Sequence, residues 1–254
     1  MDEKRKKTKA MHRLGTLLFL SILLFSSYKL GMTFWDYYKN RQVMAEAQDV
    51  YYEATIVEED SDGIRSQFGP LLEINKDIVG WITVDGTVID YPIVRAVDNE
   101  YYLNRSFKHE ETRAGSIFMD YRNNVEMNNR NIILYGHRMR DGSMFTQLNQ
   151  YLEEDFFYSH PIFYFDTLYK GYDVEVFSAY LTTTDFYYIE TDFQSDADYQ
   201  TFIERLKEKS LFESDVTIEE TDQIITLSTC DYTLDRDTGR LVVHGKLKER
   251  SSVQ

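Results

Sequence analysis

The sequence has a single cysteine, Cys230, among its 254 residues, together with only three prolines and 12 glycines. One cysteine excludes an internal disulfide framework and any zinc or iron–sulfur site that needs several cysteines. The shortage of proline and glycine leaves no low-complexity linker, and no internal repeat is visible. The chain is 43% hydrophobic and 15% aromatic, a composition that excludes wholesale disorder. Its length indicates about one domain with appendages.

Positive charge is also scarce, with 28 Lys and Arg against 43 Asp and Glu and a net charge of -15. A chain this acidic lacks the basic surface that displaces counterions from DNA or RNA, so we expect no nucleic-acid partner. Residues 1–35 nevertheless hold seven basic and two acidic residues, whereas residues 36–254 carry a net charge of -20. The basic N-terminal end is therefore a separate segment attached to an acidic body.

One long hydrophobic run, residues 14–35, contains a single charge, Lys29. A bilayer core about 30 Å thick needs about 20 apolar residues in a helix, which predicts a transmembrane anchor at 14–35. The basic tail at 1–13 predicts a cytoplasmic N-terminus and an extracellular body attached to the cell membrane. The alternative is a cleaved signal peptide with its apolar core at 14–25, but no small-x-small cleavage site follows.

The body divides into a segment predicted to be helical, residues 36–78, and a main domain, residues 79–254. Asp85-Gly86 between two β-like runs, 79–84 and 87–91, predicts a hairpin. Residues 144–158 and 197–212 are predicted to be helical. Many short strands with few helices indicate a mainly β fold, a closed or nearly closed barrel. The further predicted strands are 116–119, 131–136, 162–165, 172–181, 223–230 and 240–247.

Cys230 ends a predicted strand, and Arg240 opens the next one after nine residues. If these strands pair antiparallel, the thiol and the guanidinium become neighbours at one end of the sheet. A guanidinium there favours the thiolate and can hold a developing oxyanion. The alternative interpretation is an inert buried cysteine beside a strand-edge arginine.

A nucleophilic cysteine needs a proton-transfer partner, normally histidine. His12 lies on the cytoplasmic side, His109 in a charged loop and His160 in a turn, while His244 is about 13 Å from Arg240 along one strand. His137 remains, at the end of the apolar run 132–135, where functional loops emerge. A purely structural role for His137 stays open.

The sequence resembles the class B sortases, the membrane-anchored cysteine transpeptidases of Gram-positive bacteria. The resemblance covers roughly residues 70–248. The stretches that carry it are Gly80-Trp81-Ile82, Ile89-Asp90-Tyr91-Pro92, Asp98–Leu103, Gly115–Asp120, Tyr135-Gly136-His137, Asp141–Phe145, Thr226–Cys230 and Gly239–Gly245.

The resemblance implies a barrel of about eight strands with N-terminal helices and a helix between late strands, residues 79–254 being the catalytic domain. It implies a catalytic triad of His137, Cys230 and Arg240. It also implies a substrate groove that includes Asn99, Leu103, Thr184, Tyr188, Ile189 and Ser228, with the backbone N–H of Asp231 assisting Arg240 at the oxyanion.

The expected reaction cleaves a C-terminal sorting motif of a surface protein after Thr, through a thioester on Cys230, and transfers the product to an amine of peptidoglycan. This chemistry needs no metal or other cofactor. Three alternatives stay open: a pilin-polymerising class B sortase with a pilin amine as acceptor, a cysteine hydrolase in which water replaces the amine, and an inert membrane-tethered wall protein.

Overall fold

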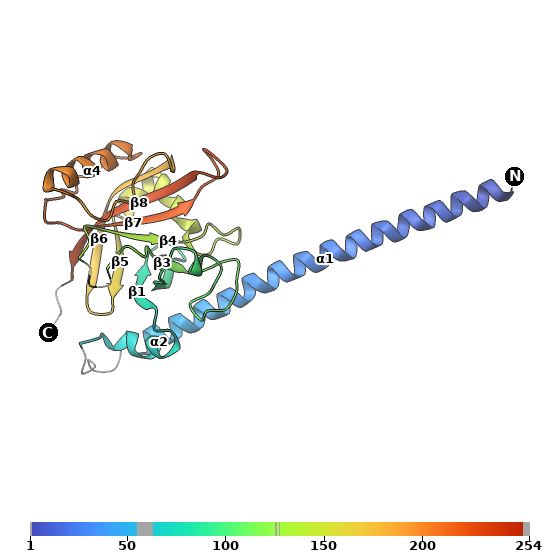
Figure 1. Ribbon diagram of the computed structural model, residues 1–254, viewed down its shortest axis with the longest axis horizontal. Helices are drawn as coiled ribbons and strands as arrows, with labels where there is room; N and C mark the ends of the chain where they lie inside the picture. The colour runs from blue at the N-terminus through green and yellow to red at the C-terminus, as the bar shows by residue number, and fades with distance from the viewer. Residues whose placement is uncertain (1, 55–62, 125, 127, 251–254) are drawn as a thin grey trace. The chain divides into compact units, whose positions relative to one another are not determined.

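The computed structural model describes residues 2–54, 63–124, 126 and 128–250. The chain divides into two compact units, Met1–Gln42 and Val43–Gln254. Among the described residues, eight strands close into a barrel in the order β1-β2-β3-β4-β7-β8-β6-β5 (Figure 1). The strands are β1 (Ile78–Thr83), β2 (Asp90–Val94), β3 (Ile117–Met119), β4 (Asn131–Tyr135), β5 (Ile162–Thr167), β6 (Gly171–Thr183), β7 (Ile224–Cys230) and β8 (Gly239–Glu249).

The helical elements are few, and α4 lies between the late strands β6 and β7 in the chain, as expected. The predicted mainly β, closed eight-stranded barrel is thereby confirmed. The α-helices are α1 (Asp2–Glu53), α2 (Gly69–Ile74), α3 (Glu154–Ser159) and α4 (Asp196–Lys209), and the 3-10 helices are η2 (Ser66–Phe68), η3 (Tyr101–Leu103) and η4 (Phe145–Leu152).

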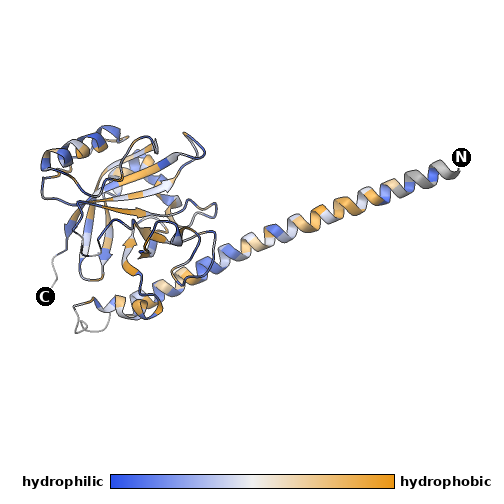
Figure 2. Cartoon of the chain, viewed as in Figure 1, coloured by the Kyte–Doolittle hydropathy of each residue, from blue (hydrophilic) through white to orange (hydrophobic). Residues whose placement is uncertain are grey.

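The first compact unit consists of most of α1, which contains the apolar run at 14–35 (mostly orange in Figure 2). Twenty-two helical residues at 1.5 Å each span about 33 Å, so the helix is long and apolar enough to cross a membrane. A signal sequence passes the same test of length and composition.

The predicted hairpin is present, because β1 and β2 pair antiparallel across a turn at Gly86, whose φ is +74°. The second strand begins later than expected, at Asp90 rather than at Thr87. The reason is that the Thr87 hydroxyl donates to the carbonyl of Val84 at 2.7 Å and keeps this residue in the turn.

Two predicted helices have different limits in the structure. Residues 144–158 form not one helix but η4 followed by α3, with extended backbone at Glu153 between them. The helix predicted at 197–212 is α4, which ends earlier, at Lys209. The Ser195 hydroxyl accepts the amide hydrogen of Asp198 at 3.1 Å and caps its N-terminus. The predicted helical segment 36–78 includes residues 55–62, which lie outside the described residues. In its described part, α1 continues to Glu53 and η2 and α2 cover 66–74, but residues 63–65 and 75–77 are not helical and Ile78 already begins β1.

The core has two layers within the second unit. Strand residues with no exposed surface, such as Ile132 and Phe163, belong to the barrel, and Tyr51 of α1 stacks on Trp81 of β1 with ring centroids 4.1 Å apart. A second cluster joins α4, through residues such as Tyr199, to β6 and β8. This second layer matters for the site, because it also holds the connection between β6 and α4.

Candidate active site

Cys230 and Arg240 occupy opposite positions where β7 and β8 begin to separate. The antiparallel register of these strands pairs Cys230 with Arg240, and directly opposite residues have Cβ atoms about 4.5–5.5 Å apart. The Arg240 guanidinium donates through Nη1 to the carbonyl of Gly239 at 2.8 Å and to that of Asp237 at 3.2 Å. These bonds hold it at the base of the β7–β8 loop.

His137 reaches the same end of the sheet from β4. Strands β4 and β7 are parallel and pair Tyr135 with Ser228, so the residue two places beyond Tyr135 lies at the level of Cys230. The His137 ring is fixed by a 2.7 Å contact from Nε2 to the carbonyl of Leu103. Because a carbonyl oxygen only accepts, Nε2 carries a hydrogen, and Nδ1 is left for proton exchange.

Gly136 allows this approach because there is no room for a side chain beside it. A Cβ at this position would lie 2.4 Å from Cδ1 of Ile117 and 2.8 Å from the Phe145 ring. The Gly136 amide donates to the carbonyl of Ser228 at 3.3 Å. The glycine therefore lets the chain pack closely against β3 and η4 immediately before His137.

A cavity of about 220 Å³ brings the three residues of the expected triad together. Asn99, Leu103 and Ser228, which were expected in the substrate groove, also line it. The complete lining is Asn99, Leu103, Phe118, Tyr135, Gly136, His137, Ser228, Thr229, Cys230 and Arg240.

The remaining residues expected in the groove, three from the β6–α4 connection and Asp231, do not line this cavity. Thr184 is exposed, and Ile189 is half-buried against the α4 cluster. Tyr188 is buried, and its hydroxyl lies 2.8 Å from the hydroxyl of Ser228, behind the cavity wall. Burial raises the pKa of Tyr188, so its hydroxyl stays protonated.

Asp231 differs from its expected role. Its amide, expected to assist at the oxyanion, donates to the carbonyl of Gly239 at 3.0 Å and is engaged in this structure. Its carboxylate accepts the amide hydrogen of Thr233 at 2.7 Å and forms an ion pair with Arg138. Because Arg138 follows His137 and Asp231 follows Cys230, this ion pair ties together the two segments that carry the thiol and the imidazole.

The other four histidines are not among the residues that line the cavity. His12 is in α1, His109 contacts tyrosine hydroxyls, and His160 stacks on a neighbouring aromatic ring. His244 is fully buried on β8, and this desolvation lowers its pKa to about 3. Of the five histidines, His137 is thus the one that lines the cavity.

Four lining residues were not expected from the sequence: Phe118, Tyr135, Gly136 and Thr229. Phe118 and Tyr135 are paired across β3 and β4, with ring centroids 5.3 Å apart, and form one wall. Both lie within stretches that carry the resemblance, Gly115–Asp120 and Tyr135-Gly136-His137, which was a usable signal. Thr229 precedes Cys230 directly, so its place in the lining follows from that of the cysteine.

A thiol, an imidazole and a guanidinium around one cavity at the rim of a closed barrel are the groups that a cysteine-dependent acyl-transfer enzyme uses. The chain matches the sortase domain family over residues 82–248. It is 44% identical over 232 residues to sortase B of Listeria monocytogenes, covering 91% of this chain and 94% of that protein. The chain belongs to the sortase family of cysteine transpeptidases.

Solved structures agree with this assignment to the family. Sortase B from Bacillus anthracis in complex with AAEK1 is 60% identical, with a TM-score of 0.78, and covers 85% of this chain and 100% of that chain. The Staphylococcus aureus sortase B–substrate complex is 42% identical, with a TM-score of 0.77, and covers 84% of this chain and 98% of that chain. The expected likeness to class B sortases is confirmed.

Proposed function

We propose that this sortase cleaves a C-terminal sorting motif after Thr and transfers the protein to an amine of peptidoglycan, with His137, Cys230 and Arg240 as the catalytic residues. The observation that carries the proposal is the position of these three side chains around one cavity, Cys230 facing Arg240 across the β7–β8 ladder. The apolar part of α1 serves as the membrane anchor, with the N-terminus in the cytoplasm and the body outside.

In the first half-reaction, Cys230 as thiolate, beside His137 as imidazolium, attacks the carbonyl carbon of the Thr residue. The tetrahedral intermediate places negative charge on the carbonyl oxygen, and the Arg240 guanidinium stabilises it. The C–N bond then breaks, and His137, as imidazolium, gives its proton to the leaving amine. The acyl group remains on Cys230 as a thioester.

In the second half-reaction, an amine of the acceptor attacks the thioester carbon. Its nitrogen loses a proton to His137, a new amide forms, and the sulfur of Cys230 leaves as thiolate. The hydrogen bond from Nε2 of His137 to the Leu103 carbonyl leaves Nδ1 as the nitrogen that exchanges the proton in both steps.

The experiment uses the full chain in detergent micelles with quenched fluorescent peptides, NPQTN-like and PxTG-like, each with and without an amine acceptor. Wild type is compared with Cys230→Ala, His137→Ala and Arg240→Ala. The proposal predicts a ligated product that requires both the amine and all three side chains.

The alternatives give different products. Cleavage that is unchanged by the amine indicates a cysteine hydrolase, and preferential ligation to a lysine side chain of a pilin peptide indicates pilin polymerisation. Cleavage that survives Cys230→Ala contradicts the mechanism, and a Cys230 that ignores thiol-reactive probes, with no peptide cleaved, indicates an inert wall protein.

A further inference from the structure

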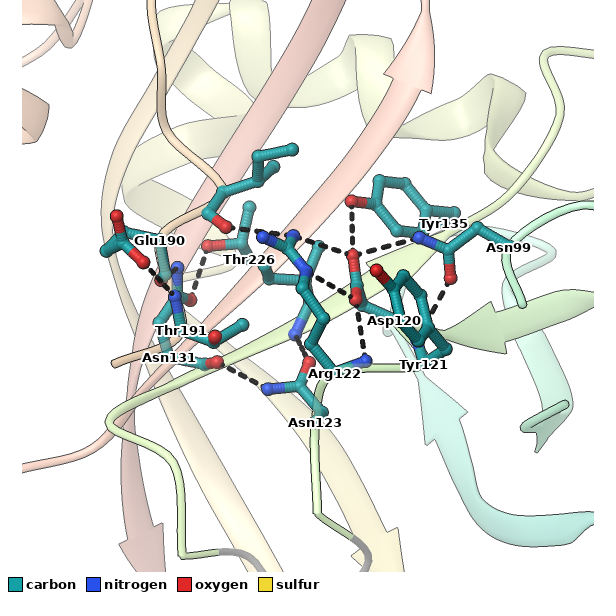
Figure 3. Close-up of polar contacts among 12 residues, drawn as sticks. Asn99, Asp120, Tyr121, Arg122, Asn123, Asn131, Tyr135, Glu190, Thr191 and Thr226 are labelled. Carbon is teal, nitrogen blue, oxygen red and sulfur yellow. Dashed lines mark hydrogen bonds and ion pairs between the residues drawn. The ribbon is translucent and has the colours of Figure 1, made fainter. Parts of the chain in front are cut away.

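Asp120, directly after β3, is the centre of a buried polar network beside the cavity (Figure 3). Its side chain has no exposed surface. Arg122 donates to it from Nε and Nη2, each at 2.9 Å, and from its backbone amide, also at 2.9 Å. The Tyr135 hydroxyl at 2.9 Å and the Asn99 amide nitrogen at 3.0 Å donate to Oδ2.

Two of these partners are part of the cavity wall. Asn99 comes from the connection between β2 and η3, and Tyr135 is the last residue of β4. The Asn99 side-chain oxygen accepts the amide hydrogen of Tyr121 at 3.0 Å, so both ends of this amide are fixed. Its nitrogen carries two hydrogens, and one remains for a ligand after the bond to Asp120 is made.

Arg122 extends the network to the β6–α4 connection. Nη2 donates to the carbonyl of Ile189 at 3.0 Å, and Nη1 donates to the hydroxyl of Tyr187 at 3.2 Å. The residue between them, Tyr188, contacts the cavity-lining Ser228 through its hydroxyl. Arg122 therefore fastens the chain on both sides of the tyrosine that supports the cavity wall.

The charge of Asp120 is needed to hold these donors together. Burial acts to raise the pKa of this carboxyl, but the hydrogen bonds from Arg122, Tyr135 and Asn99 outweigh it, and the pKa is lowered. Removing one member of a buried ion pair leaves the other member buried without its partner. This costs far more stability than the loss of an exposed contact. The arrangement therefore depends on both members of the Asp120–Arg122 pair.

We propose that Asp120 and Arg122 are positioning residues for the sorting-signal peptide. They fix Asn99 and Tyr135 in the cavity wall, and they fasten the 187–189 segment, whose Tyr188 hydroxyl contacts the cavity-lining Ser228. The assignment rests on the proposed function, because it names the peptide as the ligand, but the fastening itself is a property of the chain alone. Neither residue lines the cavity that holds Cys230, so neither takes part in bond making.

The chain offers a matched control in Asp166. This carboxylate is also largely buried, and it accepts from Arg65 Nη1 at 2.7 Å, from the Tyr51 hydroxyl at 2.8 Å and from Arg250. It pairs with Gly171 at the start of β6, whereas Arg240 pairs near the end of that strand. Asp166→Asn therefore breaks a comparable network far from the cavity.

The kinetic test measures kcat and KM for peptide cleavage by the full chain in detergent, for wild type, Asp120→Asn, Arg122→Gln and Asp166→Asn. We expect the first two variants to raise KM about tenfold, since each loses charge-assisted hydrogen bonds, with kcat within about twofold. Asp166→Asn should leave KM unchanged. Equal KM changes in Asp120→Asn and Asp166→Asn, or an unchanged KM in Asp120→Asn, would overturn the proposal.

A second measurement needs no substrate. Hydrogen exchange of backbone amides in residues 186–191 should accelerate about tenfold in Asp120→Asn and stay at the wild-type rate in Asp166→Asn. Unchanged exchange in Asp120→Asn overturns the fastening of this segment. If wild type cleaves no peptide, the proposed function fails, and hydrogen exchange alone still decides whether Asp120 and Arg122 hold the segment.

Discussion

Acid should destabilise the folded body through His244. This imidazole is fully buried, with the Tyr180 hydroxyl 2.8 Å from Nε2 and the Thr226 hydroxyl 2.9 Å from Nδ1. Thr226 in turn donates its hydroxyl hydrogen to the side-chain oxygen of Asn131 at 2.7 Å, so the Thr226 oxygen accepts the hydrogen on Nδ1. In neutral His244, Nε2 then carries no hydrogen and accepts the Tyr180 hydroxyl. Neutral His244 therefore satisfies both neighbours, whereas a second ring proton on Nε2 would deprive the Tyr180 hydroxyl hydrogen of its acceptor.

The magnitude follows from proton linkage. Desolvation lowers the pKa of His244 from 6.5 to about 3 in the folded state. As the pH falls below about 6.5, the unfolded chain takes up a proton that the folded chain does not, so stability decreases until the pH approaches about 3. Between pH 7 and pH 5 this difference is about 2 kcal/mol at 1.36 kcal/mol per pKa unit.

Urea unfolding of the full chain in detergent, followed by near-ultraviolet circular dichroism at pH 7 and pH 5, measures this effect. A loss of about 2 kcal/mol corresponds to a decrease of about 4–8 °C in Tm for a body of this size. His244→Gln keeps a donor and an acceptor but cannot titrate, so its stability should depend less on pH by this amount. An equal decrease in wild type and in His244→Gln would refute the reasoning.

Three further substitutions test the geometry of the cavity. Gly136→Ala would force a methyl group against Ile117, so we expect about 1–3 kcal/mol of lost stability in urea unfolding and at least about a tenfold loss in kcat/KM. Tyr188→Phe removes one buried hydroxyl and should raise KM by up to about tenfold, with kcat retained; an unchanged KM contradicts its supporting role. Arg138→Gln breaks the tie to Asp231 and should lower kcat more than it raises KM; a pure KM effect would argue against positioning of the catalytic segments.

Much of the barrel could be predicted from the sequence because local patterns determine it. The hairpin turn at Asp85-Gly86, the apolar run before Gly136 and the strand ending at Cys230 each carry a short-range signal. The start of β2 was placed too early, because the side-chain bond of Thr87 within the turn competes with strand pairing. The single helix predicted at 144–158 is wrong because hydrophobic periodicity does not show where η4 ends and α3 begins.

The expected triad required more than local patterns. The antiparallel pairing of β7 and β8 places Arg240 opposite Cys230, and this could be inferred from one short loop. The parallel pairing of β4 with β7, which brings His137 to the same end, joins segments about 90 residues apart in the sequence. The resemblance to sortases supplied that link.

Contacts made by backbone atoms and buried charges could not be predicted in this way. The carbonyl of Leu103 that holds the His137 ring has no side-chain signature. The engaged amide of Asp231 follows from the close approach to Gly239, where a Cβ would lie 2.0 Å from the Asp231 carbonyl oxygen. Asp120 and Arg122 look like ordinary surface charges in the sequence, and only the fold buries the carboxylate.

The most direct test of the account is capture of the acyl-enzyme on Cys230. The full chain in detergent is mixed with an intact sorting-motif peptide that it cleaves, quenched in acid and analysed by intact and peptide mass spectrometry. We predict an adduct equal to the peptide up to and including Thr, bound to Cys230, absent in Cys230→Ala and released by added amine as an amide product. Peptide cleavage by Cys230→Ala, or an adduct on another residue in wild type, would contradict the central claim.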